Sequence, residues 1–160
     1  MSRPDPSQTP VLVTSLHVAA ERHAPMVAVD QVEARAGEGL VGDRYFGTRH
    51  RHVSVQSATD LAAAAGDLGA PVTDDATRRN VTLSHGEVPT EPGARLRIGE
   101  VLLEVVRVAA PCPVMDVSVG PGARRALRRR GGSVFRLLEG GTLRVGDTAE
   151  RVPDDGRGAD

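Results

Sequence analysis

Short runs of β-branched and aliphatic residues, rather than long helical repeats, dominate the hydrophobic pattern of this chain. Runs of strand length occur at 11–18, 26–32, 52–56, 80–83, 95–98, 101–108, 134–138, 142–145 and 148–152. Gly99 and Glu100 separate two of these runs and suit a tight hairpin turn. Many short strands without regular strand–helix alternation predict a mainly β, barrel-like fold with few helices.

Two segments favour helices. Ser57 is followed three residues later by Asp60, which resembles a capping box, and the alanine-rich run that follows has high helix propensity. The second candidate helix is 121–130, with a proline near its first turn and two glycines after its end. Residues 1–10 contain three prolines and no apolar periodicity, and 153–160 are similarly polar. We therefore expect a folded domain at 11–152 between a flexible leader and a flexible tail.

Composition narrows the class of protein. A chain of 160 residues suits one domain, and 39% apolar residues with only 2% aromatic predict an aliphatic core. The net charge of −1 predicts neither a nucleic-acid nor a membrane partner. No signal-like segment or long apolar run is present, so we expect a cytoplasmic protein. All twenty basic residues are arginine, and the lack of lysine excludes pyridoxal phosphate chemistry and a P-loop.

The chain has a single cysteine, Cys112, directly after the run at 101–108. Pro111 and Pro113 stiffen the backbone on both sides, which predicts a rigid, non-helical turn that holds the thiol in the open or in a cleft rimmed by arginine. The alternative is a small buried hydrophobe, the common state of a free cysteine. Thiols react as thiolates, which nearby positive charge stabilises.

Three segments could supply that charge. The first is 42–52, either a phosphate-binding loop or a solvated, flexible connection, and its basic side chains are Arg44, Arg49, His50, Arg51 and His52. The second, 123–130, carries five arginines and is interpreted as a solvated helix face. The third contains Arg79 and Asn80, either an anion-binding fork or a turn. We expect the first and third segments to converge on one anion pocket. Two histidines on one side of a strand start are too few for a stable zinc site.

Five segments, in this order and spacing, resemble the MOSC domain family, named for the C-terminal domain of molybdenum cofactor sulfurases. They are GDRYFG at 42–47, TRRNVTL at 77–83, PGARLRIGEVLLEV at 92–105, PCPVM at 111–115 and EGGTLRVGD at 139–147. The resemblance covers about residues 11–150 and implies a β-barrel-like fold of the pyruvate-kinase type. Tyr45 departs from the pattern, because relatives frequently have histidine there.

The resemblance also implies a site. Cys112 maps to the functional cysteine, which in cofactor-bound relatives is also the molybdenum ligand. Arg44, Arg79 and Asn80 map to basic segments that contact the cofactor or an anion. Arg49 and His52, in the first basic segment, are added as cofactor-binding candidates.

Three functions follow as hypotheses. The first is binding of molybdenum cofactor (molybdopterin) through Cys112, with reduction of N-hydroxylated substrates and an electron-transfer partner. The second is a sulfur carrier that holds a persulfide on Cys112, accepted from a separate desulfurase. The third is a non-catalytic β scaffold for partner binding in which Cys112 is merely packed.

Overall fold

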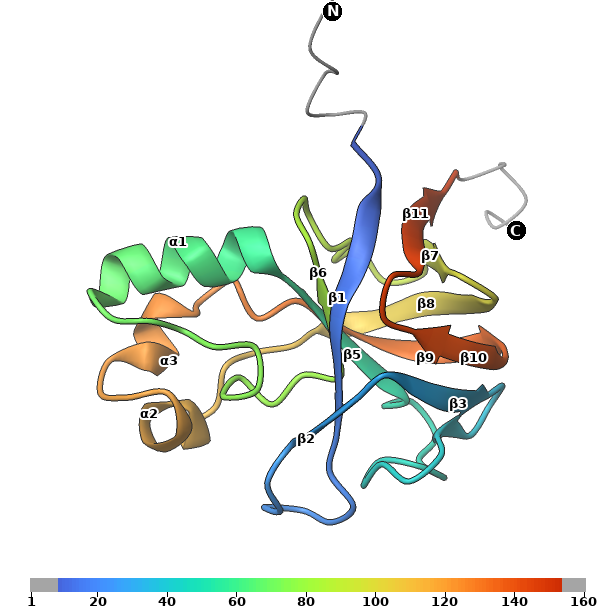
Figure 1. The fold of residues 1–160 in the computed structure, drawn as a ribbon, viewed down its shortest axis with the longest axis horizontal. Helices are drawn as coiled ribbons and strands as arrows, with labels where there is room; N and C mark the ends of the chain where they lie inside the picture. Colours follow the sequence, from blue (N-terminus) through green and yellow to red (C-terminus); the bar gives the residue numbers. More distant parts are fainter. Residues whose placement is uncertain (1–8, 154–160) are drawn as a thin grey trace, which may run out of the picture.

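Seven strands form a closed barrel in the computed structural model, which describes residues 9–153 (Figure 1). The barrel strands are β1 (Val11–Val18), β5 (Val53–Ser57), β6 (Val81–Leu83), β7 (Arg95–Ile98), β8 (Val101–Val108), β9 (Ser133–Glu139) and β11 (Thr148–Val152). Their order is β11-β7-β8-β9-β5-β6-β1, and pairing of β11 with β1 closes the ring. The predicted leader and tail lie almost wholly outside the described residues.

The strands β5 and β6 are parallel, whereas the other pairs of the barrel are antiparallel. A parallel pair needs a crossover, and α1 (Ala58–Leu68) provides it. The predicted cap is present, because the Ser57 hydroxyl oxygen accepts a hydrogen bond from Thr59 N at 3.2 Å. The predicted β7–β8 hairpin is also present, with Ile98 opposite Val101 across the turn.

Four short strands lie outside the ring. The strand β2 (Val27–Val29) extends the barrel sheet beside β1, and β3 (Gln31–Arg35), β4 (Gly39–Leu40) and β10 (Gly141–Arg144) are involved in a separate three-stranded sheet. The single strand predicted at 26–32 was therefore wrong, because the chain leaves one sheet and enters the other at Asp30.

The core is aliphatic, as the composition predicts. Aliphatic side chains from all seven barrel strands fill it, and Phe135 is the one aromatic side chain buried among them within residues 9–153. A second, smaller cluster contains Leu61, Ala64, Met115, Ala123 and Leu127. It joins the three helices at one end of the molecule (Figure 1).

The helix predicted at 121–130 was wrong in extent. Only Ala123–Ala126 are helical (α3), because Gly122 has a left-handed φ of 87° at its start and Arg129 one of 63° beyond its end. A helix that was not predicted, α2 (Val114–Ser118), begins after Pro113, a residue that suits a helix start. Within the described part of the chain, no helix is long and apolar enough to cross a bilayer.

Candidate functional site

Cys112 lies between the end of β8 and the start of α2, and its side chain is exposed. Its carbonyl oxygen accepts a hydrogen bond from Met115 N at 2.9 Å, which joins the cysteine to the first turn of α2. The exposure agrees with the prediction from the two flanking prolines. It excludes the alternative in which Cys112 is a packed hydrophobe.

The loop that follows β4 is anchored by Asp43, whose side chain is fully buried. Its Oδ1 accepts hydrogen bonds from Ala19 N at 3.1 Å and from Asn80 Nδ2 at 3.3 Å, and it pairs with Arg44 Nη1 at 3.2 Å. Arg44 Nη2 in turn donates to the carbonyl oxygen of Arg78 at 3.4 Å. The segments around Arg44 and around Arg79 and Asn80 therefore lie together, although of these three residues only Arg44 lines a pocket.

Asn80 has its side-chain amide occupied within the protein. Its Oδ1 accepts from Ser54 N, and its Nδ2 donates to the His17 carbonyl, both at 3.0 Å, in addition to the bond to Asp43. Only 2% of the residue is exposed. The side chain of Asn80 therefore joins β1, β5 and the Asp43 loop through hydrogen bonds. Its role is to stabilise the backbone around the site.

Arg79 is a buried cation that holds the two ends of the segment carrying Cys112. Its Nε donates to the Gly131 carbonyl at 2.9 Å and its Nη2 donates to the Ala109 carbonyl at 3.4 Å. A Cβ at Gly131 would contact the Ala109 carbonyl and would lie 3.2 Å from Arg79 Nη2, so this approach requires glycine. Burial lowers the pKa of Arg79 to about 10, and the side chain therefore stays charged at neutral pH.

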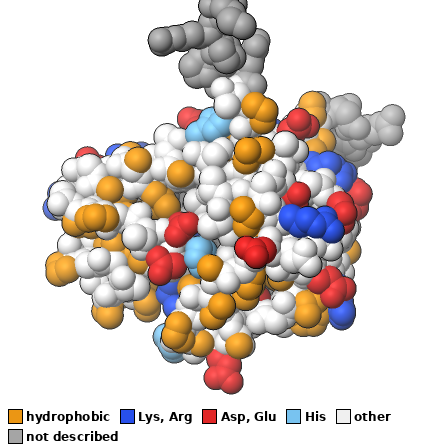
Figure 2. All heavy atoms as spheres, viewed as in Figure 1, with side chains coloured by type: hydrophobic (Ala, Val, Ile, Leu, Met, Phe, Trp, Pro, Cys, Tyr) orange, Lys and Arg blue, Asp and Glu red, His pale blue; other side chains and the backbone are white. Residues whose placement is uncertain are grey.

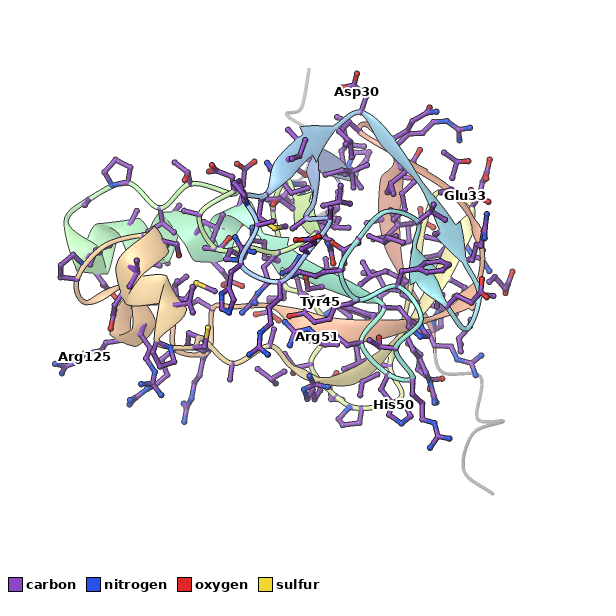
Figure 3. The ribbon with its side chains drawn as sticks, turned by 90° about the horizontal axis from the view of Figure 1, so that it is seen from below. Asp30, Glu33, Tyr45, His50, Arg51 and Arg125 are labelled. Atoms are coloured by element: carbon purple, nitrogen blue, oxygen red, sulfur yellow. The ribbon has the colours of Figure 1, made fainter. Side chains whose placement is uncertain are left out.

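An open pocket of about 530 Å³ adjoins this region and is lined by Ala20, Glu21, Arg22, Arg44, Tyr45 and Arg51. The guanidinium carbons of Arg44 and Arg51 lie 4.5 Å and 4.1 Å from the centre of the Tyr45 ring. Figure 3 shows Tyr45 and Arg51 side by side near the middle of the molecule, between the helices and the barrel. The aromatic ring thus packs against both guanidinium groups at the pocket wall.

Three arginines interact electrostatically with the Cys112 side chain. Burial lowers the pKa of Arg51, and repulsion from Arg107 and Arg44 lowers it further, while the Tyr45 and Cys112 side chains raise it. Burial also lowers the pKa values of Arg78 and Arg79, on which Cys112 has the same raising effect. The cysteine is therefore within electrostatic range of three guanidinium groups.

Arg51 has an unused donor. Its Nε is buried and has no hydrogen-bond partner among residues 9–153. Asp43 pairs with Arg44, but Arg51, Arg78 and Arg79 form no salt bridge with a described carboxylate. Buried donors and unpaired cations favour an anionic ligand, which would supply both the acceptor atoms and the missing negative charge.

Two of the predicted cofactor contacts are not brought into this site. His52 is 2% exposed, its Nδ1 accepts from Leu137 N at 2.9 Å, and its Nε2 lies 2.8 Å from the Thr48 carbonyl. Both ring nitrogens are thus used by the backbone, and none is free for a ligand. Arg49 is exposed and is not among the pocket-lining residues. His50 is exposed, at the lower side of the molecule in Figure 3, whereas His52 is buried, so the two histidines do not share a face.

Sequence reasoning missed several residues of the site. Arg51 was counted in the basic segment but not selected, and Tyr45 was noted only as a departure from the family pattern. Glu21 and Arg22 lie in a polar loop after β1 that carries no motif. Within the described residues, no group of three or more His, Cys, Asp and Glu side chains is placed to hold a metal ion.

The fold is shared with solved structures of low sequence identity. The YUAD protein from Bacillus subtilis superposes with a TM-score of 0.74 at 18% identity, covering 88% of this chain and 94% of that one. YiiM from Geobacillus stearothermophilus gives a TM-score of 0.69 at 19% identity, covering 94% and 78%. YiiM from Escherichia coli gives 0.65 at 16% identity, covering 89% and 70%.

No curated protein sequence matches the chain significantly. Residues 42–150, however, match the MOSC domain. This match covers more than half of the chain and includes Cys112, Arg51, Arg78 and Arg79. The chain therefore belongs to the MOSC domain family.

Proposed function

We propose that this protein binds the molybdenum cofactor beside Cys112, with the cysteine sulfur as a molybdenum ligand and the surrounding arginines as contacts for the phosphate of the cofactor. The observation that carries this proposal is the excess of positive charge around an exposed thiol. Arg51, Arg78 and Arg79 lie in electrostatic range of Cys112 without carboxylate partners among residues 9–153.

The residues present fit such a ligand. The buried Nε of Arg51 lacks an acceptor, and a phosphate oxygen would supply one. The planar guanidinium fork matches the geometry of phosphate, and a thiolate is a soft metal ligand. When bound, the cofactor would supply the redox chemistry, for which N-hydroxylated compounds are the proposed substrates.

The chain's own residues would position that ligand. Arg79 ties together the two ends of the Cys112 segment through Ala109 and Gly131, and this holds the thiol in place relative to the pocket. Glu21, the acidic residue of the pocket lining, would accept hydrogen bonds from amino groups of a ligand. The pocket lining thus offers three guanidinium groups and one carboxylate to a ligand.

The test is to produce the protein in a bacterial host that makes the cofactor and to measure bound molybdenum and pterin. The wild type is expected to contain both, and the Cys112→Ser variant to lose molybdenum while melting at nearly the same temperature, because the side chain is exposed. Ser118→Ala, on the neighbouring helix, is the matched control and should load normally. Equal molybdenum in the wild type and the Cys112→Ser variant would contradict the proposed ligand.

The exposure of Cys112 also favours a second candidate, a sulfur carrier. An exposed thiol on a stiff segment is accessible to the active site of another protein, such as a desulfurase. A protein that contains no molybdenum but gains the mass of one sulfur atom on Cys112, after incubation with a cysteine desulfurase and cysteine, would favour the carrier over the cofactor-binding protein.

A further inference from the structure

We propose that the surface formed by α2 and α3, next to Cys112, docks a partner protein through an acidic face of that partner. We call this surface the α2–α3 face. It is formed by Val114, Val117, Arg124, Arg125, Arg128 and Arg129, all of them exposed. The proposal builds on the proposed function only in that Cys112 is the group which the docked protein would reach.

The arginines of this face are uncompensated. None of the four forms a salt bridge with a carboxylate within residues 9–153. The nearest acid in sequence, Asp116, uses its Oδ1 to accept from the backbone N of Arg124 at 3.0 Å. Arg130, by contrast, turns to Asp67 and pairs with it at 2.5 Å. Figure 3 shows Arg125 extending into solvent from the helical end of the molecule.

The apolar part of the face lies on α2. Val117 is 87% exposed and Val114 is 36% exposed, and their spacing of three residues places them on the same side of the helix. Val108, at the end of β8 before Cys112, is a further exposed valine at 45%. Apolar side chains beside a rim of arginines are typical of protein–protein interfaces. The face has no aromatic residue on which bases could stack, which favours a protein over a nucleic acid as the occupant.

The face is joined rigidly to the thiol. Met115 of α2 is buried against Ala123 and Leu127, so that α2 and the α3 segment move as one unit. The backbone bond from Met115 N to the Cys112 carbonyl links this unit to the cysteine. A protein docked on the α2–α3 face would therefore cover or approach Cys112.

The positive charge of the α2–α3 face favours an acidic partner. The whole chain has a net charge of −1, so it does not attract acidic proteins as a whole. The local excess of arginine on the α2–α3 face would do so over short distances, in a way that added salt weakens. Binding of an acidic protein should accordingly depend on this face and not on the total charge of the chain.

The test uses two small acidic proteins as probes, a plant-type ferredoxin and a flavodoxin, with affinity measured by calorimetry at low ionic strength. The variant Arg125→Ser/Arg128→Ser should bind about tenfold more weakly than the wild type. The control Arg35→Ser/Arg151→Ser removes the same charge from β3 and β11 and should bind within about twofold of the wild type. A bound probe should also slow alkylation of Cys112, the only thiol, by neutral N-ethylmaleimide.

Equal weakening in the two variants, no binding of either probe, or no protection of Cys112 would overturn the proposal. So would tighter, α2–α3-face-dependent binding of a single-stranded DNA oligonucleotide, or self-association of the wild type through the α2–α3 face in sedimentation experiments. The double variant should retain molybdenum, because its substitutions lie outside the pocket. Cys112→Ser should still bind the probes, so failure of docking and failure of the proposed cofactor site are distinguishable.

Discussion

The arginines of the barrel and the arginines near Cys112 are in opposite electrostatic situations. On the barrel and the adjoining three-stranded sheet, six arginines each pair with a glutamate. They are Arg35, Arg95, Arg97, Arg136, Arg144 and Arg151. Near the pocket and on the α2–α3 face, Arg51, Arg78, Arg79 and the four α2–α3-face arginines have no carboxylate partner among residues 9–153. Figure 2 shows basic side chains beside acidic ones on the barrel side of the molecule.

This difference distinguishes arginines that stabilise the fold from arginines that could bind an anion. Exposed ion pairs contribute little to folding, typically about 0–1 kcal/mol, but they keep the barrel surface close to neutral. Unpaired and partly buried cations oppose folding, because burial removes their hydration and neighbouring cations repel them. Their concentration around one exposed thiol is what a ligand site requires, since an anion would relieve both penalties.

The largest effect is expected from Arg79, a buried site arginine whose guanidinium group donates to two backbone carbonyls. Arg79→Ala removes the donors to the Gly131 and Ala109 carbonyls and leaves a space, at a cost of about 2–4 kcal/mol in the free energy of unfolding. Arg97→Ala, in an exposed ion pair with Glu139, should cost less than about 1 kcal/mol. Urea denaturation measures both, and equal losses would remove the distinction between the two regions.

A smaller effect is expected from the most buried acid of the barrel surface. Glu104 is 8% exposed and pairs with both Arg95 and Arg136. Glu104→Gln should lower the free energy of unfolding by about 1–2 kcal/mol, because two guanidinium groups lose a charged acceptor. Glu33→Gln, in an exposed pair, is the control and should stay within about 0.5 kcal/mol of the wild type. An unchanged free energy of unfolding for Glu104→Gln would show that ion pairs of the barrel do not stabilise the fold even where the carboxylate is buried.

At Arg51 we expect a substitution to leave stability unchanged or to raise it, in contrast to Arg79 and Glu104. Arg51→Gln removes an unpaired, half-buried cation, so the melting temperature should stay unchanged or rise slightly, by the equivalent of about 0.5 kcal/mol or less. Pyrophosphate at a hundredfold excess over its dissociation constant should stabilise the wild type by about 2.7 kcal/mol, and this stabilisation should be lost in the variant. Thermal unfolding with and without pyrophosphate measures both quantities. A destabilised variant that still responds to pyrophosphate would place the anion elsewhere.

The smallest effect is expected in the dependence of the melting temperature on acidic pH. The backbone N–H of Thr142 and the side chain of Arg144 hold the pKa of Glu100 below its ordinary value of 4.5. A carboxylate with a lowered folded-state pKa stabilises the fold above its unfolded-state value, and this contribution is lost as the pH falls through the folded-state pKa. The melting temperature of the wild type should thus fall below pH 4.5 slightly more steeply than that of Glu100→Gln. Identical pH profiles would show that this barrel pair has no effect on folding.

Local patterns predicted much of the fold. The strands at 11–18, 95–98, 101–108 and 148–152 match β1, β7, β8 and β11, because β-branched runs bounded by turn residues have few other stable conformations. Ser57 predicted the start of α1 for the same local reason. The two prolines predicted an exposed Cys112, since they exclude it from the interior of a strand or helix. Where several short-range signals competed, at 26–32 and 121–130, the boundaries were wrong.

The sequence by itself determined a mainly β domain with an aliphatic core, a stiffly held thiol and an excess of arginine in identifiable segments. Only the tertiary structure decided which of those arginines lie within electrostatic range of the thiol. Arg51, Arg79 and Cys112 come from three distant segments, and their proximity depends on the pairing of β5 with β6 and β9 and of β8 with β9. The same packing assigned His52 and Asn80 to backbone partners, because a buried polar group must find a hydrogen bond wherever the surrounding strands place it.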